Sequence, residues 1–123
     1  MNRITDSHGD IIGYLYNMMI LNKEMDTVIG LVIGNCVFGK DKEPVGKLFN
    51  DFFWHLNGEK LGKLDKEMLD SKPKTPIEKA FIFNAWKILN NVQNHTCIWI
   101  EEKKKWHKKG LVFILQEDKQ LMA

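Results

Sequence analysis

The chain has 123 residues and the composition of one ordinary globular domain, with 44% hydrophobic and 28% charged residues, which excludes a disordered or fibrous protein. Lysine and arginine outnumber aspartate and glutamate by 18 to 16. This surplus is too small to predict a nucleic-acid or membrane partner from overall charge, so the prediction of such a partner has to rest on a local charged patch.

Glycine recurs at nearly equal intervals in the first half of the chain, at Gly13, Gly30, Gly46 and Gly62, with gaps of 17, 16 and 16 residues. A unit of this length cannot bury its own apolar face, so its copies have to pack against each other. An aliphatic residue precedes each glycine and another follows two positions later. A β-bulge near each glycine would bring both to one side. We expect two core layers: Ile12, Ile29, Val45 and Leu61, and then Leu15, Val32, Leu48 and Leu64.

Turn signals alternate with apolar segments about every eight residues through this region, which predicts an antiparallel meander of about eight short strands. One set of polar turns precedes the glycines, and Asn57-Gly58 is its strongest hairpin signal. A second set consists of Asn17-Met18, Gly34-Asn35 and Asn50-Asp51. The predicted strands include Ile11–Tyr16, Val28–Ile33, Val45–Phe49 and Phe52–Leu56, with a further one at Lys66–Leu69.

Two octapeptides carry the unit most fully. They are His8-Gly9-Asp10-Ile11-Ile12-Gly13-Tyr14-Leu15 and Asn57-Gly58-Glu59-Lys60-Leu61-Gly62-Lys63-Leu64. These octapeptides resemble the four-fold β-flower family of small bacterial proteins. The resemblance covers residues 3 to about 70 and implies four hairpin-like units around a pseudo-four-fold axis. It implies no activity and no site residues. Met25 and Lys42 depart from the pattern, because they stand where the turn glycine would be.

The second half of the chain predicts a helix and a hairpin after a linker at residues 69–74. Thr75 is a suitable N-cap, Pro76 suits the first helical position and Glu78 completes a capping box. Two runs rich in β-branched and aromatic residues, Thr96–Ile100 and Leu111–Leu115, predict two strands. The helix would bury one stripe made of Ile77, Ala80, Phe81, Ala85, Ile88, Leu89 and Val92.

Together these elements predict one domain over residues 1–123, α+β but mainly β. Residues 3–70 would form the four-repeat meander, and residues 75–123 would pack on it as the helix and hairpin. Cys36 and Cys97 lie in apolar stretches, which favours buried free thiols and an intracellular protein. Asp6 and His8 interrupt any apolar signal segment, and no stretch reaches the roughly 18 apolar residues of a membrane span. We therefore expect a soluble, cytoplasmic protein.

The only dense charge cluster lies at the tip of the predicted hairpin, where five of the seven residues from Lys103 to Lys109 are lysines. Its lysines could neutralise phosphates while Trp106 stacks on an unpaired base or inserts at a lipid interface. Alternatively, the lysines only keep two sticky strands soluble. The candidate binding residues are Lys103, Lys104, Lys105, Trp106, Lys108 and Lys109.

Other chemistry has weaker support. Asp10, Asp26, Glu43 and Glu59 take matching positions in the repeats, so a ring of carboxylates on the repeat axis could bind a cation, although such residues are common in soluble turns. The histidines, His8, His55, His95 and His107, lack zinc-site spacing, and the two serines, Ser7 and Ser71, lack a G-x-S-x-G motif. We expect no metal and no cofactor. The aromatic set would line a ligand pocket, fill the core or form an interface: Tyr14, Tyr16, Phe38, Phe49, Phe52, Phe53 and Trp54.

The sequence therefore favours a non-enzymatic binding or protein-interaction module, which forms a homo-oligomer or binds another protein. One alternative is nucleic-acid binding through the Lys103–Lys109 tip. The other is a small metal-dependent enzyme with its site on the repeat axis.

Overall fold

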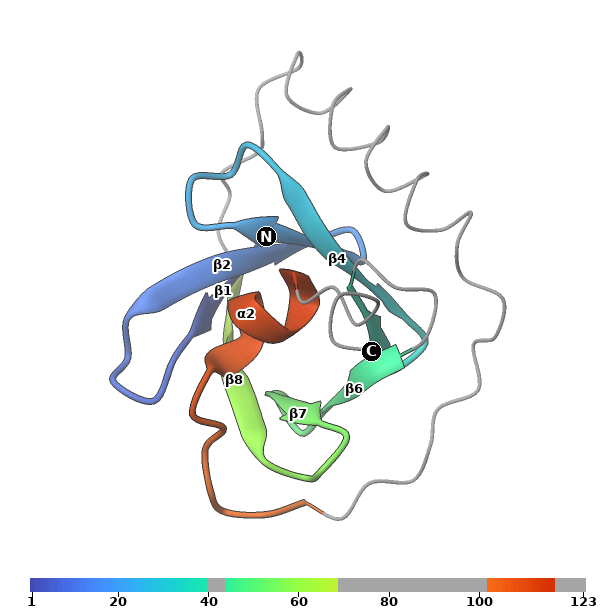
Figure 1. Ribbon diagram of the computed structural model, residues 1–123. Coiled ribbons are helices and arrows are strands. Elements are labelled where there is room, and N and C mark those ends of the chain that lie inside the picture. The colour runs from blue at the N-terminus through green and yellow to red at the C-terminus, as the bar shows by residue number, and fades with distance from the viewer. Residues whose placement is uncertain (40–43, 69–101, 117–123) are drawn as a thin grey trace.

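The computed structural model of the protein describes residues 1–39, 44–68 and 102–116. Its strands form a closed antiparallel barrel, in which each strand pairs with the next along the chain and the last pairs back with the first. This order confirms the predicted meander and the mainly β character of the fold. Figure 1 shows helix α2 (Gly110–Gln116) in the middle of the ring of strands. The strands are β1 (Asn2–Thr5), β2 (Ile11–Tyr16), β3 (Met19–Asn22), β4 (Val28–Ile33), β5 (Cys36–Phe38), β6 (Pro44–Phe49), β7 (Phe52–His55) and β8 (Lys60–Met68).

The second set of predicted turns is confirmed, because three hairpins have two-residue loops. Asn17 and Met18 have φ angles of +47° and +67°, which is the geometry of a type I′ turn. Each turn is also tied to the following hairpin by a backbone hydrogen bond of 2.8 Å. The amide groups of Val32, Leu48 and Leu64 donate to the carbonyl groups of Met18, Asn35 and Asp51 respectively.

A register shift lies beside four of the glycines. Ile4 pairs with Gly13 but Thr5 pairs with Ile11, so Ile12 is an extra residue on β2. The same shift leaves Ile29, Val45 and Leu61 without a strand partner on β4, β6 and β8. A bulge moves the inward and outward alternation by one residue, so residues three apart come to the same side.

The interior of the barrel holds one core cluster, and all eight residues of the two predicted layers belong to it or pack against it. Ile29, Val32, Val45 and Leu61 are buried, while the other four are partly buried. Phe53 belongs to the same cluster. Tyr14 belongs to a second cluster with Met1, Leu21, Val28 and Leu31. Much of the aromatic set is therefore core, as one of the sequence interpretations has it.

The strand predicted at Leu111–Leu115 is wrong, because this run forms α2. Leu111, Ile114 and Leu115 are buried in the barrel core, at the spacing of one helix face, while Phe113 is 45% exposed. A short apolar run fits a buried strand and a buried helix equally well. The pairing of β1 with β8 leaves the barrel no free edge, so the run buries its side chains in the barrel mouth instead. A Cβ atom on Gly30 would lie 2.7 Å from the carbonyl oxygen of Phe38 and 2.9 Å from Cδ2 of Leu115, so the glycine makes room for both β5 and the helix.

Several other predicted elements lie partly or wholly outside the described residues. Residues 66–68 end β8 and form no separate strand, and Leu69 lies outside the described residues. So do the linker, the helix that would begin at Thr75, the strand Thr96–Ile100 and the turn at residues 40–43. Within the described ranges, no helix is long and apolar enough to cross a membrane.

Cys36 is buried on β5 as expected, but it is disulfide-bonded, so the expectation of a free thiol is wrong. Separation along the sequence does not report distance in the folded chain, which is why the spacing of the cysteines was misleading. The expectation of an intracellular protein loses the support of a free thiol here. Cys97 lies outside the described residues.

Candidate nucleic-acid interface

The segment of residues 102–109 lies beside the start of β8, and we call it the basic ledge. The amide of Lys103 donates to the carbonyl of Gly58 over 2.9 Å. The amide of Lys60 donates to the carbonyl of Lys105, and the amide of His107 donates to the carbonyl of Lys60, both over 2.8 Å. The ledge therefore runs parallel to the start of β8, with Trp106 opposite Lys60. The prediction of a hairpin tip is wrong, since α2 follows the ledge directly.

The ledge keeps most of its positive charge. Its five lysines are exposed. The Nζ atom of Lys105 lies 3.7 Å from Oε2 of Glu59, whereas Glu102 forms its ion pair with Lys47, at 3.5 Å. No carboxylate of the described residues forms an ion pair with any of the other four lysines. These are Lys103, Lys104, Lys108 and Lys109.

Glu59 forms the ion pair with Lys105, and its surroundings favour the ionised carboxylate. The side-chain amide of Asn57 donates to Oε1 of Glu59 over 2.7 Å. This hydrogen bond is the main reason that the pKa of Glu59 is lowered; desolvation opposes it, and the charges of Lys105, His107 and Lys103 lower the pKa further. The carboxylate therefore offsets part of the charge of Lys105 and helps to hold the ledge against β8.

Trp106 anchors the ledge to an aromatic cluster on the barrel wall. Its ring meets the ring of Phe52 edge-on, with centroids 6.2 Å apart, and Phe52 in turn lies 5.6 Å from Trp54. The ammonium group of Lys60 lies over all three rings, at 4.4 Å from the centroid of Phe52, 5.8 Å from Trp106 and 5.9 Å from Trp54. Such cation–π contacts are attractive, because the ring faces are electron-rich. Trp106 is half-buried, so it is part of the wall and not an isolated exposed ring.

His55, at the end of β7, and His107, in the ledge, lie next to each other, and the sequence analysis did not predict this contact. The ring centroids of His55 and His107 are 4.8 Å apart. Each Nδ1 atom accepts a backbone amide hydrogen, from Asn57 at 3.2 Å and from Lys109 at 3.1 Å. In the neutral state each ring therefore carries its proton on Nε2. Only knowledge that the ledge pairs with β8 would have revealed this contact, because the two residues are far apart in sequence.

No protein family, curated protein or solved structure matches this chain. The roles of the site residues consequently rest on their geometry in this chain. No activity, substrate or partner is transferred from another protein.

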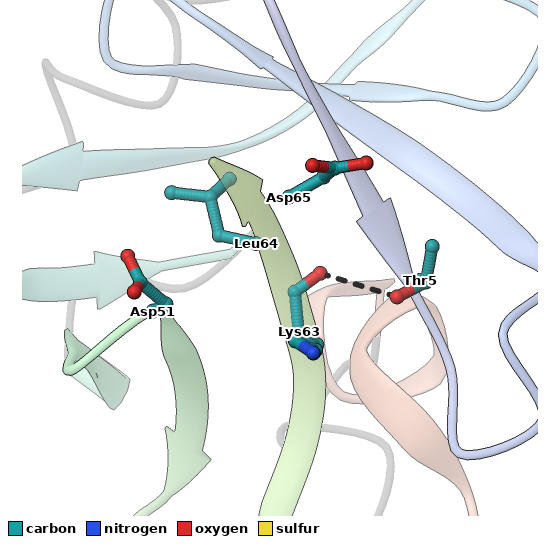
Figure 2. A pocket seen from close by; sticks show the side chains of 5 residues that line it. All are labelled: Thr5, Asp51, Lys63, Leu64 and Asp65. Atoms are coloured by element: carbon teal, nitrogen blue, oxygen red, sulfur yellow. Dashed lines mark hydrogen bonds between the residues drawn. The ribbon is translucent and has the colours of Figure 1, made fainter. Parts of the chain in front are cut away.

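A separate pocket of about 370 Å³ lies between the turn at Asp51 and the seam of β1 with β8. Thr5, Lys63, Leu64 and Asp65 line the rest of it, and Figure 2 shows Leu64 between the side chains of Asp51 and Asp65. The hydroxyl of Thr5 donates to the carbonyl of Lys63 over 3.5 Å. Asp65 accepts a 2.9 Å ion-paired hydrogen bond from Arg3. These two bonds join β1 to β8 and so help to close the barrel.

The predicted ring of carboxylates is not formed by its described members. Asp26 accepts a hydrogen bond from the side chain of Asn22 over 2.6 Å and one from Thr27 over 3.0 Å, and these two bonds lower its pKa. Glu59 faces the ledge, and Asp10 is exposed in its own turn. Across the described residues there is no group of three or more histidine, cysteine, aspartate or glutamate side chains able to hold a metal ion. Glu43 lies outside those residues.

Proposed function

We propose that this protein is a non-enzymatic binding module, and that the basic ledge is its binding face for single-stranded nucleic acid. One observation carries the proposal: three backbone hydrogen bonds fix the ledge beside Gly58–Lys60 while its five lysines stay exposed. A fixed backbone lowers the entropy cost of bringing several charges to one ligand. Clustered lysines on such a scaffold suit the phosphates of a nucleic acid.

The alternative explanation for the lysines was that they keep two exposed strands soluble. That reasoning needs a strand on each side of the cluster, but the segment on its C-terminal side is α2, whose apolar residues are buried in the barrel. A solvated loop also needs no pairing with β8. These two points favour a ligand for the ledge.

A flexible strand suits the ledge better than a rigid duplex. The ledge is a single short row beside one strand, and a flexible chain can bend to follow such a row. Major-groove recognition of duplex DNA instead uses a protruding helix or a two-stranded ribbon that enters the groove. The enzyme with a site on the repeat axis draws no support from the described residues, since α2 fills the barrel mouth with apolar side chains.

We also infer that the four units are copies arranged around a pseudo-four-fold axis, as the resemblance to the β-flower family implies. Support comes from the same bulge beside each repeated glycine, at Ile12, Ile29, Val45 and Leu61. In this arrangement the ledge and α2 break the symmetry, which places the binding face beside only one of the four units.

Fluorescence anisotropy with a labelled single-stranded oligonucleotide tests the proposed function. With about four unpaired lysines engaged, the logarithm of affinity falls against the logarithm of salt with a slope of about −2.8, so that affinity drops about 50-fold from 50 to 200 mM salt. Replacing Lys103 and Lys104 by alanine halves the slope to about −1.4. The matched control removes the same charge elsewhere, through Lys23→Ala and Lys63→Ala, both exposed and outside the ledge.

The control pair is expected to keep the slope and the affinity of the unchanged protein. Equal losses in the two double variants would mean that only the total charge matters. No salt-dependent binding to the unchanged protein would reject the proposed function outright.

A further inference from the structure

We infer that the basic ledge binds nucleic acid through its phosphates alone and stacks no base, so that recognition is independent of sequence. This inference rests on the proposed function and defines the ligand chemistry more closely. It also replaces the expectation, drawn from the sequence, that Trp106 stacks on an unpaired base.

The aromatic rings nearest the ledge already contact a cation. Lys60 holds its ammonium group over Phe52, Trp106 and Trp54 at once, with the shortest distance 4.4 Å. Trp54 is only 5% exposed, and its indole amine donates to the carbonyl of Phe49 over 2.9 Å. A base that stacked on this cluster would have to displace the ammonium group of Lys60.

Two exposed phenylalanine rings near the ledge contact lysines in the same way. Phe49 is 46% exposed and has the Nζ atom of Lys47 at 5.0 Å from its centroid. Phe113, on α2, is 45% exposed and has the Nζ atom of Lys109 at 4.5 Å. Single-strand binders that stack bases present bare aromatic faces to the ligand. Here the faces hold ammonium groups.

The same contacts restrict the lysine side chains before a ligand binds. A lysine side chain is flexible, and fixing it costs rotamer entropy when it binds an anion. Phe52 and Trp106 hold Lys60 in place, and Phe113 holds Lys109 in place, before any ligand arrives. The rings are therefore positioning residues for cations, and the two fixed ammonium groups extend the charge of the ledge toward phosphates.

The experiment compares two strands of equal length and charge. One is a mixed-sequence 12-nucleotide DNA, and the other is the same phosphodiester strand with every base removed. We expect dissociation constants within about threefold of each other and equal salt slopes, because the slope counts only neutralised phosphates. Stacking of even one base would favour the base-containing strand by about 5- to 150-fold, and a preference of about fivefold or more would overturn the inference.

A pair of variants tests the role of the caged lysine. Lys60→Met removes the ammonium group from the three rings, and it is expected to weaken binding of both strands by the same factor. Lys63→Met, three residues along β8 and exposed, is the matched control and is expected to leave both affinities unchanged. If Lys60→Met instead tightened binding of the base-containing strand alone, the rings would be stacking sites and the inference would be wrong.

Different results would reject the proposed function and the inference that no base stacks. Binding of neither strand would reject the proposed function and this inference with it, whereas a strong preference for bases would reject only this inference. A heparin fragment of matched charge forms a third arm, and tighter binding of heparin than of both strands would overturn nucleic acid as the ligand. Far-ultraviolet circular dichroism of each variant confirms that the barrel is retained.

Discussion

Alanine substitution along α2 distinguishes a helix in the barrel mouth from a strand at the same residues. In a strand, Phe113 would share one face with Leu111 and Leu115, and Ile114 would lie on the other face. In the helix, Ile114 shares the buried face with Leu111 and Leu115, while Phe113 points outward. The two arrangements therefore predict opposite results at Phe113 and Ile114.

The structure sets the size of the effects. Leu115 is 0% exposed and Ile114 is 5% exposed, so Leu115→Ala and Ile114→Ala each remove a buried side chain and are expected to cost about 3 kcal/mol. Phe113 is 45% exposed and its ring contacts the ammonium group of Lys109, so Phe113→Ala is expected to cost less than about 1 kcal/mol. For a domain of this size, a loss of 3 kcal/mol lowers the melting temperature by about 12 °C.

Urea denaturation followed by circular dichroism measures these free energies, and thermal melts check them. Phe113→Ala is the matched control, because it removes the larger side chain from the same helix. The reasoning is refuted if Phe113→Ala destabilises the protein as much as Leu115→Ala does while Ile114→Ala is neutral. That outcome would restore the strand.

Three further predictions concern the turns and the glycines. Met18 is 64% exposed in the left-handed region, so Met18→Gly is expected to stabilise the protein by about 1 kcal/mol in thermal melts, while Met18→Ala gives no gain. A Cβ atom on Gly46 would overlap a carbonyl oxygen of β7, whereas one on Gly62 would meet only a side-chain methyl group at 3.1 Å as its nearest neighbour. Gly46→Ala is therefore expected to cost more than 2 kcal/mol in urea denaturation and Gly62→Ala about 1 kcal/mol or less, and equal costs would contradict the close approach. Because its folded pKa is lowered, Glu59 stabilises the fold above its usual pKa of 4.5, and this contribution is lost as the pH falls through the folded value. Asn57→Ala is expected to raise the pKa of Glu59 in an NMR titration and to weaken the acid dependence of stability; an unchanged pKa would show that the hydrogen bond is not its main cause.

The barrel was predictable from the sequence because its signals are local. The type I′ turns need residues that tolerate positive φ, and Asn17 and Asn50 supply them. The bounds of β2 and β4 coincide with the predicted segments, and the aliphatic residues flanking the glycines all reach the core. Alternation and turn chemistry are properties of a few adjacent residues, so one chain is enough to show them.

The candidate site was predictable only as a list of residues. That the lysines cluster is visible in the sequence, but the pairing of the ledge with β8 brings together segments more than 40 residues apart. The contact of His55 with His107 and the cage around Lys60 have the same origin. The strand predicted at Leu111–Leu115 was wrong for another reason. This segment could form a strand only by pairing with a free edge of the sheet, and the pairing of β1 with β8 leaves the barrel no such edge.

The seam between β1 and β8 has a consequence for how the chain reaches this structure. Arg3 and Asp65, which meet across it, are 62 positions apart in sequence, whereas the other strand pairs join neighbouring segments. Bringing such distant residues together carries the largest loop-closure cost in the described barrel, and contacts of this range slow folding. The hairpins are therefore expected to form early and the ring to shut late. Variants that weaken a hairpin should therefore slow refolding, whereas variants that weaken the seam should mainly speed unfolding.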